Sequence, residues 1–389
     1  MRSVFSDEKK LSIVALSHTL PDRLIEQTTP LSANVLLLPS VGSRGKFTCV
    51  QNPAKADLQI GRYLPRLTLV GRIHSNGFVV TLRIEFSVPK LILGNNFDEL
   101  EPRDFADVLD VLYETLIGMD IKVSRDVLRK APVSAIHYSK NIAFRNYTTC
   151  SMVMSELDRI DLTRRLDLSH TDYRNGGQAI RYHANSFEVT FYDKLKDLEK
   201  ARYTEKRGME RDYGAQLDTF RREALPKELE VLRFEVRIGR RAKIKSLLKH
   251  IGINAEPTFE SLFDGRIARG VLWHFWSHVR SQLPMMDMAQ RPEDVLASLA
   301  AARKEKIRPG KLLQQLGSIM LVRSIGVRGA RAALSRYCSH RSWQRYKRDL
   351  KTFPSGNGLS FSALKQVGEA LDRFEPLRIK SLCGSAKVE

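Results

Sequence analysis

Cysteine is scarce in this sequence, and its cysteines do not occur in pairs. The four cysteines lie far apart and form no Cys-x-x-Cys motif, which argues against a zinc ribbon or a disulfide framework: Cys49, Cys150, Cys338 and Cys383. No apolar run approaches the roughly 18 residues that a membrane helix needs. The N-terminal residues MRSVFSDEKKLSIVAL are charged before any signal-peptide core can form. We therefore expect a soluble, cytoplasmic protein without a membrane partner.

Two motifs that would define other enzyme classes are also missing. The glycine-rich segment 42–46 ends in a lysine, but Phe47 stands where a P-loop requires serine or threonine, so an ATP-driven motor is not expected. His274 and His278 are spaced for one helix face, yet no acid follows His274 as a zinc metalloprotease requires. Their Trp and Phe neighbours predict a packed helix.

Acidic residues are outnumbered, above all near the C-terminus. The chain has 389 residues, with 64 Lys and Arg against 44 Asp and Glu, and a net charge of +20. Residues 301–389 carry 19 basic and six acidic residues, a difference of 19 − 6 = +13. Tyr337, Trp343 and Tyr346 are interleaved with these basic residues. A surface of this kind attracts polyanions, so we expect this region to bind the phosphate backbone of DNA.

Hydrophobic periodicity predicts an α+β fold. Residues 66–93 form two alternating runs joined at Asn76-Gly77, which is a strong hairpin signal, and residues 104–118 have the spacing of an amphipathic helix. Further strands are expected at 157–168, 186–194 and 232–238, and helices dominate from about residue 245. We predict an antiparallel sheet with helices on one face in residues 1–245, followed by a basic helical DNA-binding domain in residues 246–389.

Each of the last three predicted strands exposes one reactive residue. Strand alternation places these residues with basic neighbours on polar faces: Asp161 with Arg159, Tyr192 with Lys194, and Glu235 with Arg233 and Arg237. Two carboxylates are suitable ligands for Mg²⁺ or Mn²⁺, and a tyrosyl oxygen is a nucleophile when a nearby cation such as Lys194 favours the phenolate. Taken singly, such carboxylates more often form cross-strand ion pairs.

The ordered segments RIDL, FYDK and LRFE resemble the replication initiators of the phage and plasmid II/X type. They are also similar to the Rep_trans initiators of rolling-circle plasmids. Upstream, VPKLILGNNFDEL and IHYSKN resemble the phage-type family, and the likeness spans roughly residues 80–245. It implies a core like that of HUH and Rep nucleases, and a tyrosine that joins the 5′ phosphate of nicked origin DNA. By position, Tyr192 would be the nucleophile, Lys194 its helper, and Asp161 and Glu235 the ligands of Mg²⁺ or Mn²⁺.

The sequence departs from the HUH pattern because it contains no His-x-His motif. The metal site would then consist mainly of carboxylates or include an isolated histidine, for which His137 is the best candidate. Three acidic residues compete for the third ligand position, namely Asp167, Glu85 and Asp158. Tyr138 and Tyr182 are rival nucleophiles.

We therefore expect a rolling-circle initiator that nicks and rejoins origin DNA in a bacterial host, working with host helicase and polymerase. Arg159, Arg233 and Arg237 would neutralise the scissile phosphate. The alternative is a sequence-specific DNA-binding protein without catalysis, such as a copy-control or partition factor. An RNA-binding sheet is less favoured, because the polar faces offer charge where stacking requires aromatic residues. The first two hypotheses differ in what they require of the fold. If Asp161, Tyr192 and Glu235 do not converge in space, the nickase hypothesis fails and the non-catalytic one is favoured.

Overall fold

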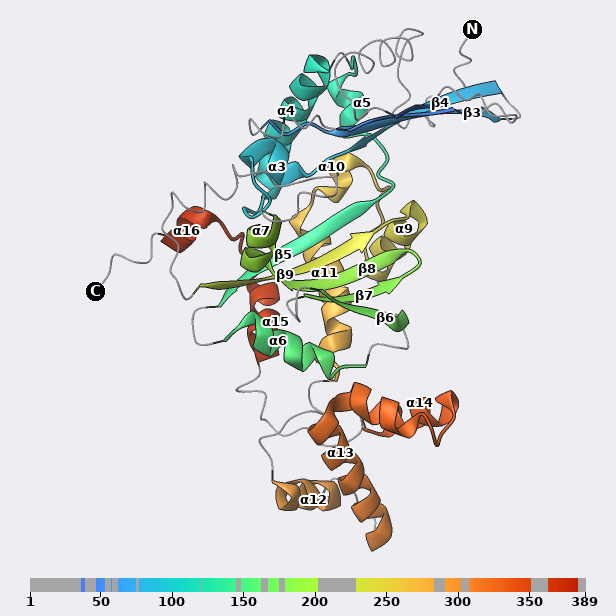
Figure 1. Ribbon diagram of the computed structural model, residues 1–389, viewed down its shortest axis with the longest axis vertical. Coiled ribbons are helices and arrows are strands. Elements are labelled where there is room, and N and C mark those ends of the chain that lie inside the picture. Colours follow the sequence, from blue (N-terminus) through green and yellow to red (C-terminus); the bar gives the residue numbers. More distant parts are fainter. Residues whose placement is uncertain are drawn as a thin grey trace.

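The structure is a computed structural model, and it combines antiparallel sheets with many helices (Figure 1). It describes residues 36–38, 47–52, 57, 62–74, 77–119, 121–144, 148–161, 167–174, 179–201, 229–282, 291–301, 308–350 and 363–383. The predicted α+β class with antiparallel strands is confirmed. None of the described helices is long and apolar enough to cross a membrane.

A four-stranded antiparallel sheet comes first along the chain, in the order β1-β2-β3-β4. Its strands are β1 (Leu36–Leu38), β2 (Phe47–Gln51), β3 (Arg66–His74) and β4 (Gly77–Glu85). The predicted hairpin is confirmed, since β3 and β4 pair from His74↔Gly77 to Arg66↔Glu85.

Four short helical elements follow that sheet: α3 (Val88–Leu93), η2 (Pro102–Asp104), α4 (Phe105–Gly118) and α5 (Arg125–Arg129). The predicted helix at 104–118 is thus confirmed as α4. Its buried Leu112 and Leu116 pack with Leu67 and Leu82 of the sheet, because apolar residues at helical spacing lie on one face of a helix.

A five-stranded sheet lies at the centre of the molecule, in the order β5-β9-β8-β7-β6, with all neighbours antiparallel. Its strands are β5 (Ile136–Phe144), β6 (Asp167–Arg174), β7 (Ala179–Ala184), β8 (Phe187–Asp193) and β9 (Glu230–Ile238). The predicted strands at 186–194 and 232–238 are therefore confirmed as β8 and β9.

Helices cover one face of the five-stranded sheet (Figure 1). They are α6 (Cys150–Asp158), α9 (Arg241–His250), α10 (Phe259–Leu262), α11 (Gly265–Arg280) and α15 (Ala363–Arg373). Phe191 and Phe234 stack with their ring centroids 4.5 Å apart, and Trp276 of α11 packs on both. The predicted domain boundary at residue 246 does not end this core, because residues of α11 and α15 belong to it.

The predicted strand at 157–168 is wrong, since residues 150–158 form helix α6. The Thr149 hydroxyl caps the helix by accepting a hydrogen bond from the Met152 amide at 3.1 Å. Val153 and Leu157 are buried at a spacing of four residues, which is typical of a helix. The apparent alternation around Ile160 was too short to predict a strand. Of the described part of the predicted segment, residues 157–161 are not strand, and residues 167–168 begin β6.

Three helices extend away from the five-stranded sheet, namely α12 (Pro292–Ala301), α13 (Pro309–Leu334) and α14 (His340–Leu350) (Figure 1). α13 begins at Pro309, which suits proline because the first helical turn needs no amide donor there. Two further helices, α7 (Lys194–Ala201) and α16 (Ile379–Cys383), pack with Val231 near the start of β9.

Gly326 interrupts α13 with a positive φ of 76° and a ψ of 169°. A Cβ atom there would lie 2.6 Å from Arg159 Cβ and 2.8 Å from its Cα and carbonyl oxygen.

We expect Gly326→Ala to lower the free energy of unfolding by about 2 kcal/mol or more, through backbone strain and this clash. Urea unfolding measures the change. Gly310→Ala is the matched control in the same helix, where nothing lies within 4 Å, and alanine should be neutral or stabilising there. Equal effects of the two substitutions would contradict the prediction.

Candidate active site

Tyr192 and Glu235 meet on the polar face of the five-stranded sheet. They lie on neighbouring strands, where Tyr192 pairs with Arg233 and Thr190 pairs with Glu235. Side chains at diagonal positions of an antiparallel pair share one face and are within reach of each other. The Tyr192 hydroxyl donates a hydrogen bond to Glu235 Oε2 at 3.2 Å. The structure thus joins two of the three residues that the sequence analysis placed in one site.

His137 approaches the same carboxylate from β5, on the other side of β9. It pairs with Arg237 in the register, and its Nδ1 lies 3.6 Å from Glu235 Oε1. The imidazole is exposed, whereas Glu235 is buried. One buried carboxylate is therefore approached by a phenol, an imidazole and, from Arg237, a guanidinium.

Glu235 also ends a row of ion pairs that crosses three strands. Arg237 Nε lies 2.8 Å from Glu235 Oε1, and its terminal nitrogens lie 3.3 Å from Glu235 Oε2 and 3.5 Å from Glu188 Oε1. Glu188 in turn lies 3.2 Å from Arg181 on β7. Rows of cross-strand ion pairs stabilise sheet surfaces that have no catalytic role, so this row agrees with the non-catalytic hypothesis. The same row leaves Arg237 partly exposed beside Tyr192.

The charges around this carboxylate set its protonation and that of the phenol. Burial alone would raise the pKa of Glu235, but Arg237, Arg233 and His137 outweigh it, and the pKa is lowered. Burial raises the pKa of Tyr192 above its ordinary value, although Arg233 opposes this. At neutral pH the free protein therefore holds an ionised Glu235 and a neutral Tyr192 phenol that donates to it.

Lys194 begins α7 directly after β8, and it lies beside Tyr192 as expected. Its ammonium is buried, sits over the Tyr192 ring at 5.9 Å from the centroid, and lies 3.3 Å from Asp197 Oδ2. This places a cation against the aromatic face. Neighbouring Asp193 accepts the Lys196 amide at 3.0 Å, which fixes where the helix starts.

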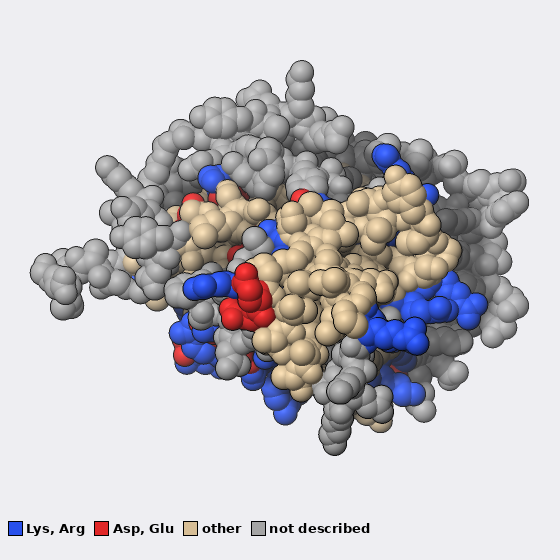
Figure 2. Space-filling view, turned by 90° about the horizontal axis from the view of Figure 1, so that it is seen from below, with Lys and Arg blue, Asp and Glu red and all other residues tan. Residues whose placement is uncertain are grey.

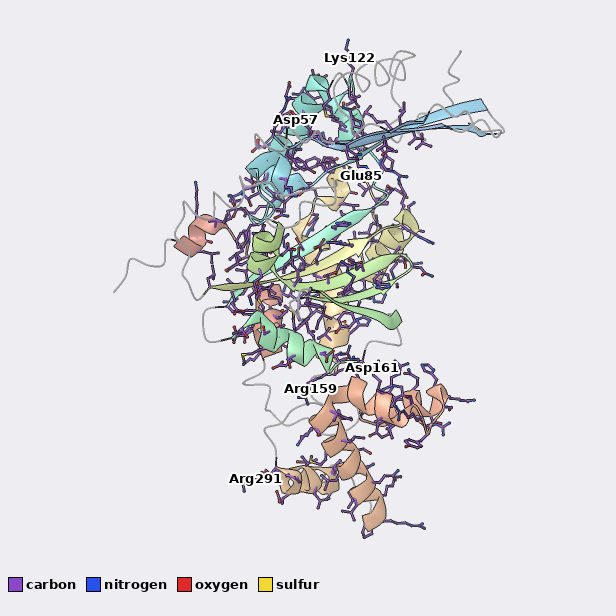
Figure 3. The ribbon with its side chains drawn as sticks, in the orientation of Figure 1. Asp57, Glu85, Lys122, Arg159, Asp161 and Arg291 are labelled. Atoms are coloured by element: carbon purple, nitrogen blue, oxygen red, sulfur yellow. The ribbon has the colours of Figure 1, made fainter. Side chains whose placement is uncertain are left out.

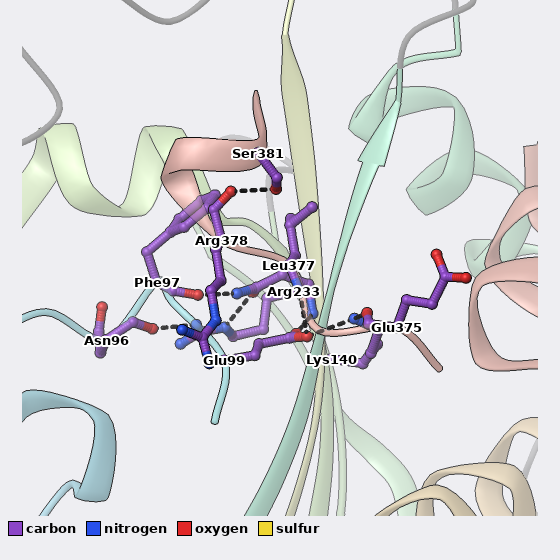
Figure 4. Close-up of polar contacts among 10 residues, drawn as sticks. Asn96, Phe97, Glu99, Lys140, Arg233, Glu375, Leu377, Arg378 and Ser381 are labelled. Carbon is purple, nitrogen blue, oxygen red and sulfur yellow. Dashed lines mark hydrogen bonds and ion pairs between the residues drawn. The ribbon is translucent and has the colours of Figure 1, made fainter. Parts of the chain in front are cut away.

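Arg233 differs from its expected role as an open phosphate contact, because it is buried in a polar network (Figure 4). Its Nε donates to Asn141 Oδ1 at 2.7 Å, and a terminal nitrogen donates to the Asn96 carbonyl. In the same network, Lys140 pairs with Glu99 at 2.5 Å. Together these contacts hold the loop before α4 against β5, the strand at the edge of the sheet.

Asp161 does not join Tyr192 and Glu235, so the expected convergence of all three is wrong. Asp161 follows α6 on the helix-covered side of the sheet, and its amide donates to Gln282, just beyond α11, at 3.0 Å. Tyr192 and Glu235 lie on the opposite face, since the adjacent Phe234 points into the helix-covered core. Figure 3 shows Asp161 and Arg159 between the sheet layer and the C-terminal helices.

The Asp161 carboxylate is fully buried and is used to hold α13 and α14. Its Oδ2 accepts hydrogen bonds from Trp343 Nε1 at 3.2 Å and from Lys347 Nζ at 3.0 Å, and its Oδ1 lies 3.5 Å from Arg331. Arg159 has a similar role, since its guanidinium donates to the Arg323 carbonyl. Neither residue is placed to contact a phosphate near Tyr192.

The rival nucleophiles lie on the wrong face of the sheet. Tyr138 donates to the Leu262 carbonyl at 3.0 Å, and Tyr182 donates to the Leu157 carbonyl at 2.9 Å. Both are buried in the core with the helices, and burial raises the pKa of each. Of the three tyrosines considered, only Tyr192 lies beside Glu235.

The competing third ligands are also distant from this carboxylate. Glu85 is on β4 of the other sheet, 3.4 Å from Arg66 (Figure 3). Asp158 pairs with Arg328 of α13. Asp167 starts β6, but its side chain lies outside the described residues. Two groups remain as ligands for Mg²⁺ or Mn²⁺, namely Glu235 and His137. Carboxylate and imidazole are ligand types found in such sites, but two side chains supply only part of the coordination shell.

A second group of possible metal ligands was missed by sequence reasoning. Cys150, Asp193 and Glu230 offer ligand atoms within 4.8 Å of one another, the one such group in the part of the chain that the structure describes. Both carboxylates accept helix amides, Glu230 from Cys150 and Asp193 from Lys196. The signal in the sequence was Asp193 directly before a helix, which is typical of an N-cap.

Comparisons with known protein families, with curated proteins and with solved structures found no match to this chain.

Proposed function

We propose that this protein is a rolling-circle replication initiator that nicks origin DNA through Tyr192 and has a core like that of HUH and Rep nucleases. The observation that carries the proposal is the 3.2 Å hydrogen bond from the Tyr192 hydroxyl to Glu235, with His137 and Arg237 beside the same carboxylate. Cleavage of a phosphodiester requires a nucleophile, a carboxylate and cations together, and this face of the sheet carries all three. The antiparallel five-stranded sheet and the resemblance of FYDK and LRFE to such initiators support it.

The proposed reaction is a transesterification. The Tyr192 oxygen forms a bond to phosphorus, and the bond from phosphorus to the 3′ oxygen breaks. The phenol proton leaves to solvent, because the lowered pKa of Glu235 makes that carboxylate a weak base. The 3′ oxygen takes a proton from solvent, which leaves a 5′ phosphotyrosyl bond and a free 3′ hydroxyl. The number of phosphoester bonds is unchanged, so the ends can be rejoined without ATP.

In the proposed reaction, Arg237 would neutralise negative charge on the scissile phosphate, together with a metal ion when one is bound. Arg237 is the arginine of the expected phosphate set that stays partly exposed beside Tyr192, at 39% of its side chain. Mg²⁺ or Mn²⁺ remains the proposed cofactor, and when bound it would screen the charge of the scissile phosphate. Glu235 and His137 would hold it, without Asp161. Origin DNA, host helicase and host polymerase remain the proposed partners.

Trapping the covalent intermediate tests this proposal. The full-length protein is incubated with single-stranded origin oligonucleotides and Mn²⁺, and adducts that survive denaturation are digested and mapped by mass spectrometry. We expect a nucleotide on Tyr192 that EDTA prevents and Mn²⁺ restores. An adduct mapped to another residue, or no adduct with any origin strand tested, would overturn the assignment.

The rate of adduct formation should rise with pH. Because the pKa of Tyr192 is raised above its ordinary value of about 10, the phenolate fraction grows about tenfold per pH unit throughout the range from about 7 to 9. Single-turnover rates with a saturating oligonucleotide measure this slope. A plateau below pH 9 would contradict the raised pKa in the DNA complex.

A second function is supported by two specific observations. Asp161 does not converge with Tyr192 and Glu235, as the nickase hypothesis required. Glu235 also lies in an ion-pair row with Arg237 and Glu188, which is common on sheet surfaces without a catalytic role. A sequence-specific DNA-binding protein of the copy-control or partition class then becomes the alternative. It predicts origin binding with no covalent adduct under any metal condition, which the trapping experiment detects directly.

A further inference from the structure

The segment that contains α13 and α14 is unusual in its charge. Residues 309–348 hold nine Lys or Arg residues and no Asp or Glu. Seen from the end of the molecule that carries these helices, Lys and Arg cover more of the described surface than Asp and Glu (Figure 2). A local excess of one sign in a folded segment points to a partner of the opposite sign.

On α14 the basic residues are sorted by face. Arg341, Arg345 and Arg348 recur at intervals of four and three residues and are exposed. This spacing places them in one line along the helix, named here the α14 arginine stripe. The opposite face carries Trp343 and Lys347, both buried.

The buried face fixes the rotation of α14. Trp343 and Lys347 both bond to the carboxylate of Asp161, and Trp343 also packs with Val322, Val327 and Ala330 of α13. An indole N–H and an ammonium that share one buried carboxylate hold the helix in a single orientation. The α14 arginine stripe therefore points outward from the molecule.

Two of the three arginines of the stripe, Arg341 and Arg345, form no ion pair with a carboxylate of the described residues. Tyr337, in the turn that leads from α13 into α14, is 85% exposed and lies beside the stripe.

From these observations we infer that α14 is the recognition helix of a helix-turn-helix unit and lies in the major groove of duplex DNA, with the α14 arginine stripe on phosphates and base edges. In such units the second helix enters the groove, and residues near its N-terminus reach the bases, where arginine suits guanine. Here α14 follows α13 after the connection Ser335–Ser339, and Arg341 lies in its first turn. Tyr337 would contact the backbone beside the groove.

A single strand and an anionic membrane fit this surface less well. A single strand needs several aromatic rings for its bases, whereas Tyr337 is the one strongly exposed aromatic ring beside the stripe among the described residues, and Trp343 is buried. A membrane helix needs an exposed apolar face, whereas the apolar face of α14 is packed against α13. The inference deepens the proposed function by assigning duplex binding to α14 and strand cleavage to Tyr192.

Binding of a labelled origin duplex, measured by fluorescence anisotropy in the full-length Tyr192→Phe background, separates recognition from cleavage. We expect Arg341→Ala/Arg345→Ala to weaken binding about tenfold or more, and to reduce the slope of log K against log salt by about 2. The matched control is Arg240→Ala/Lys249→Ala, which removes two exposed charges from the α9 region and should change affinity less than twofold. Circular dichroism should show that both variants keep the parental fold.

Equal losses in the two variants would overturn the inference, because the stripe would then act only through net charge. Selective loss of single-strand, RNA or anionic-vesicle binding, with duplex binding unchanged, would also overturn it and would identify the other partner. The outcome is separable from that of the proposed function. Stripe-dependent duplex binding without an adduct on Tyr192 supports the interface and rejects the nickase, whereas an adduct with unchanged duplex binding does the reverse.

Discussion

Tyr192→Phe is expected to abolish the covalent adduct with origin DNA, because phenylalanine has no oxygen to attack phosphorus. Protein stability should fall by only about 1 kcal/mol or less, since the substitution removes one hydrogen bond to Glu235 and leaves the ring in place. Denaturing gels with a labelled oligonucleotide measure the adduct. Binding of the duplex should be unchanged, as its contacts are assigned to α14.

Tyr113→Phe, on α4, is the control for this substitution. Its ring packs with the cluster of the four-stranded sheet and under Arg125, away from Glu235 and α14, so adduct formation should continue at the parental rate. Tyr138→Phe and Tyr182→Phe should also retain the adduct in the folded protein, because both hydroxyls are bonded to backbone carbonyls on the other face of the sheet. An adduct that persists in Tyr192→Phe would return the nucleophile to one of these residues.

Asp161→Asn is expected to lower the free energy of unfolding by about 3 kcal/mol. The carboxylate is fully buried and faces Lys347 and Arg331, so its loss leaves the buried Lys347 ammonium without its counter-ion, while Arg331 stays partly exposed. Urea unfolding followed by circular dichroism measures the change. Glu369→Gln, which breaks the exposed pair with Lys365 at 3.7 Å, is the matched control and should cost about 0.5 kcal/mol or less.

The same variant distinguishes an anchoring residue from a metal ligand. Because Asp161 lies across the sheet from Glu235, the Mn²⁺ concentration that gives half-maximal adduct formation should not change in the folded Asp161→Asn protein. The additional substitution Lys347→Met should recover part of the stability, since it removes the ammonium left uncompensated. A large shift in the Mn²⁺ requirement would contradict the position of Asp161 in the structure.

Local patterns of the sequence determined the β3–β4 hairpin, α4, β8 and β9, because alternation and helical spacing over seven or more residues identify these elements without tertiary information. They also indicated Tyr192 and Glu235, since strand alternation places both on a polar face. The C-terminal excess of charge was likewise visible in the residues themselves.

Only the tertiary structure decided which of the polar residues meet. Asp161 and Glu235 have the same local pattern, in which an acid lies between two apolar residues and two positions after an arginine. Nevertheless, Asp161 holds α14, whereas Glu235 lies beside Tyr192. The difference depends on α6 replacing the predicted strand and on contacts between residues 182 or more positions apart in the chain. Sequence periodicity specifies the face of an element. The partner of a buried charge is set by which distant elements pack on that face, and no local pattern contains that information.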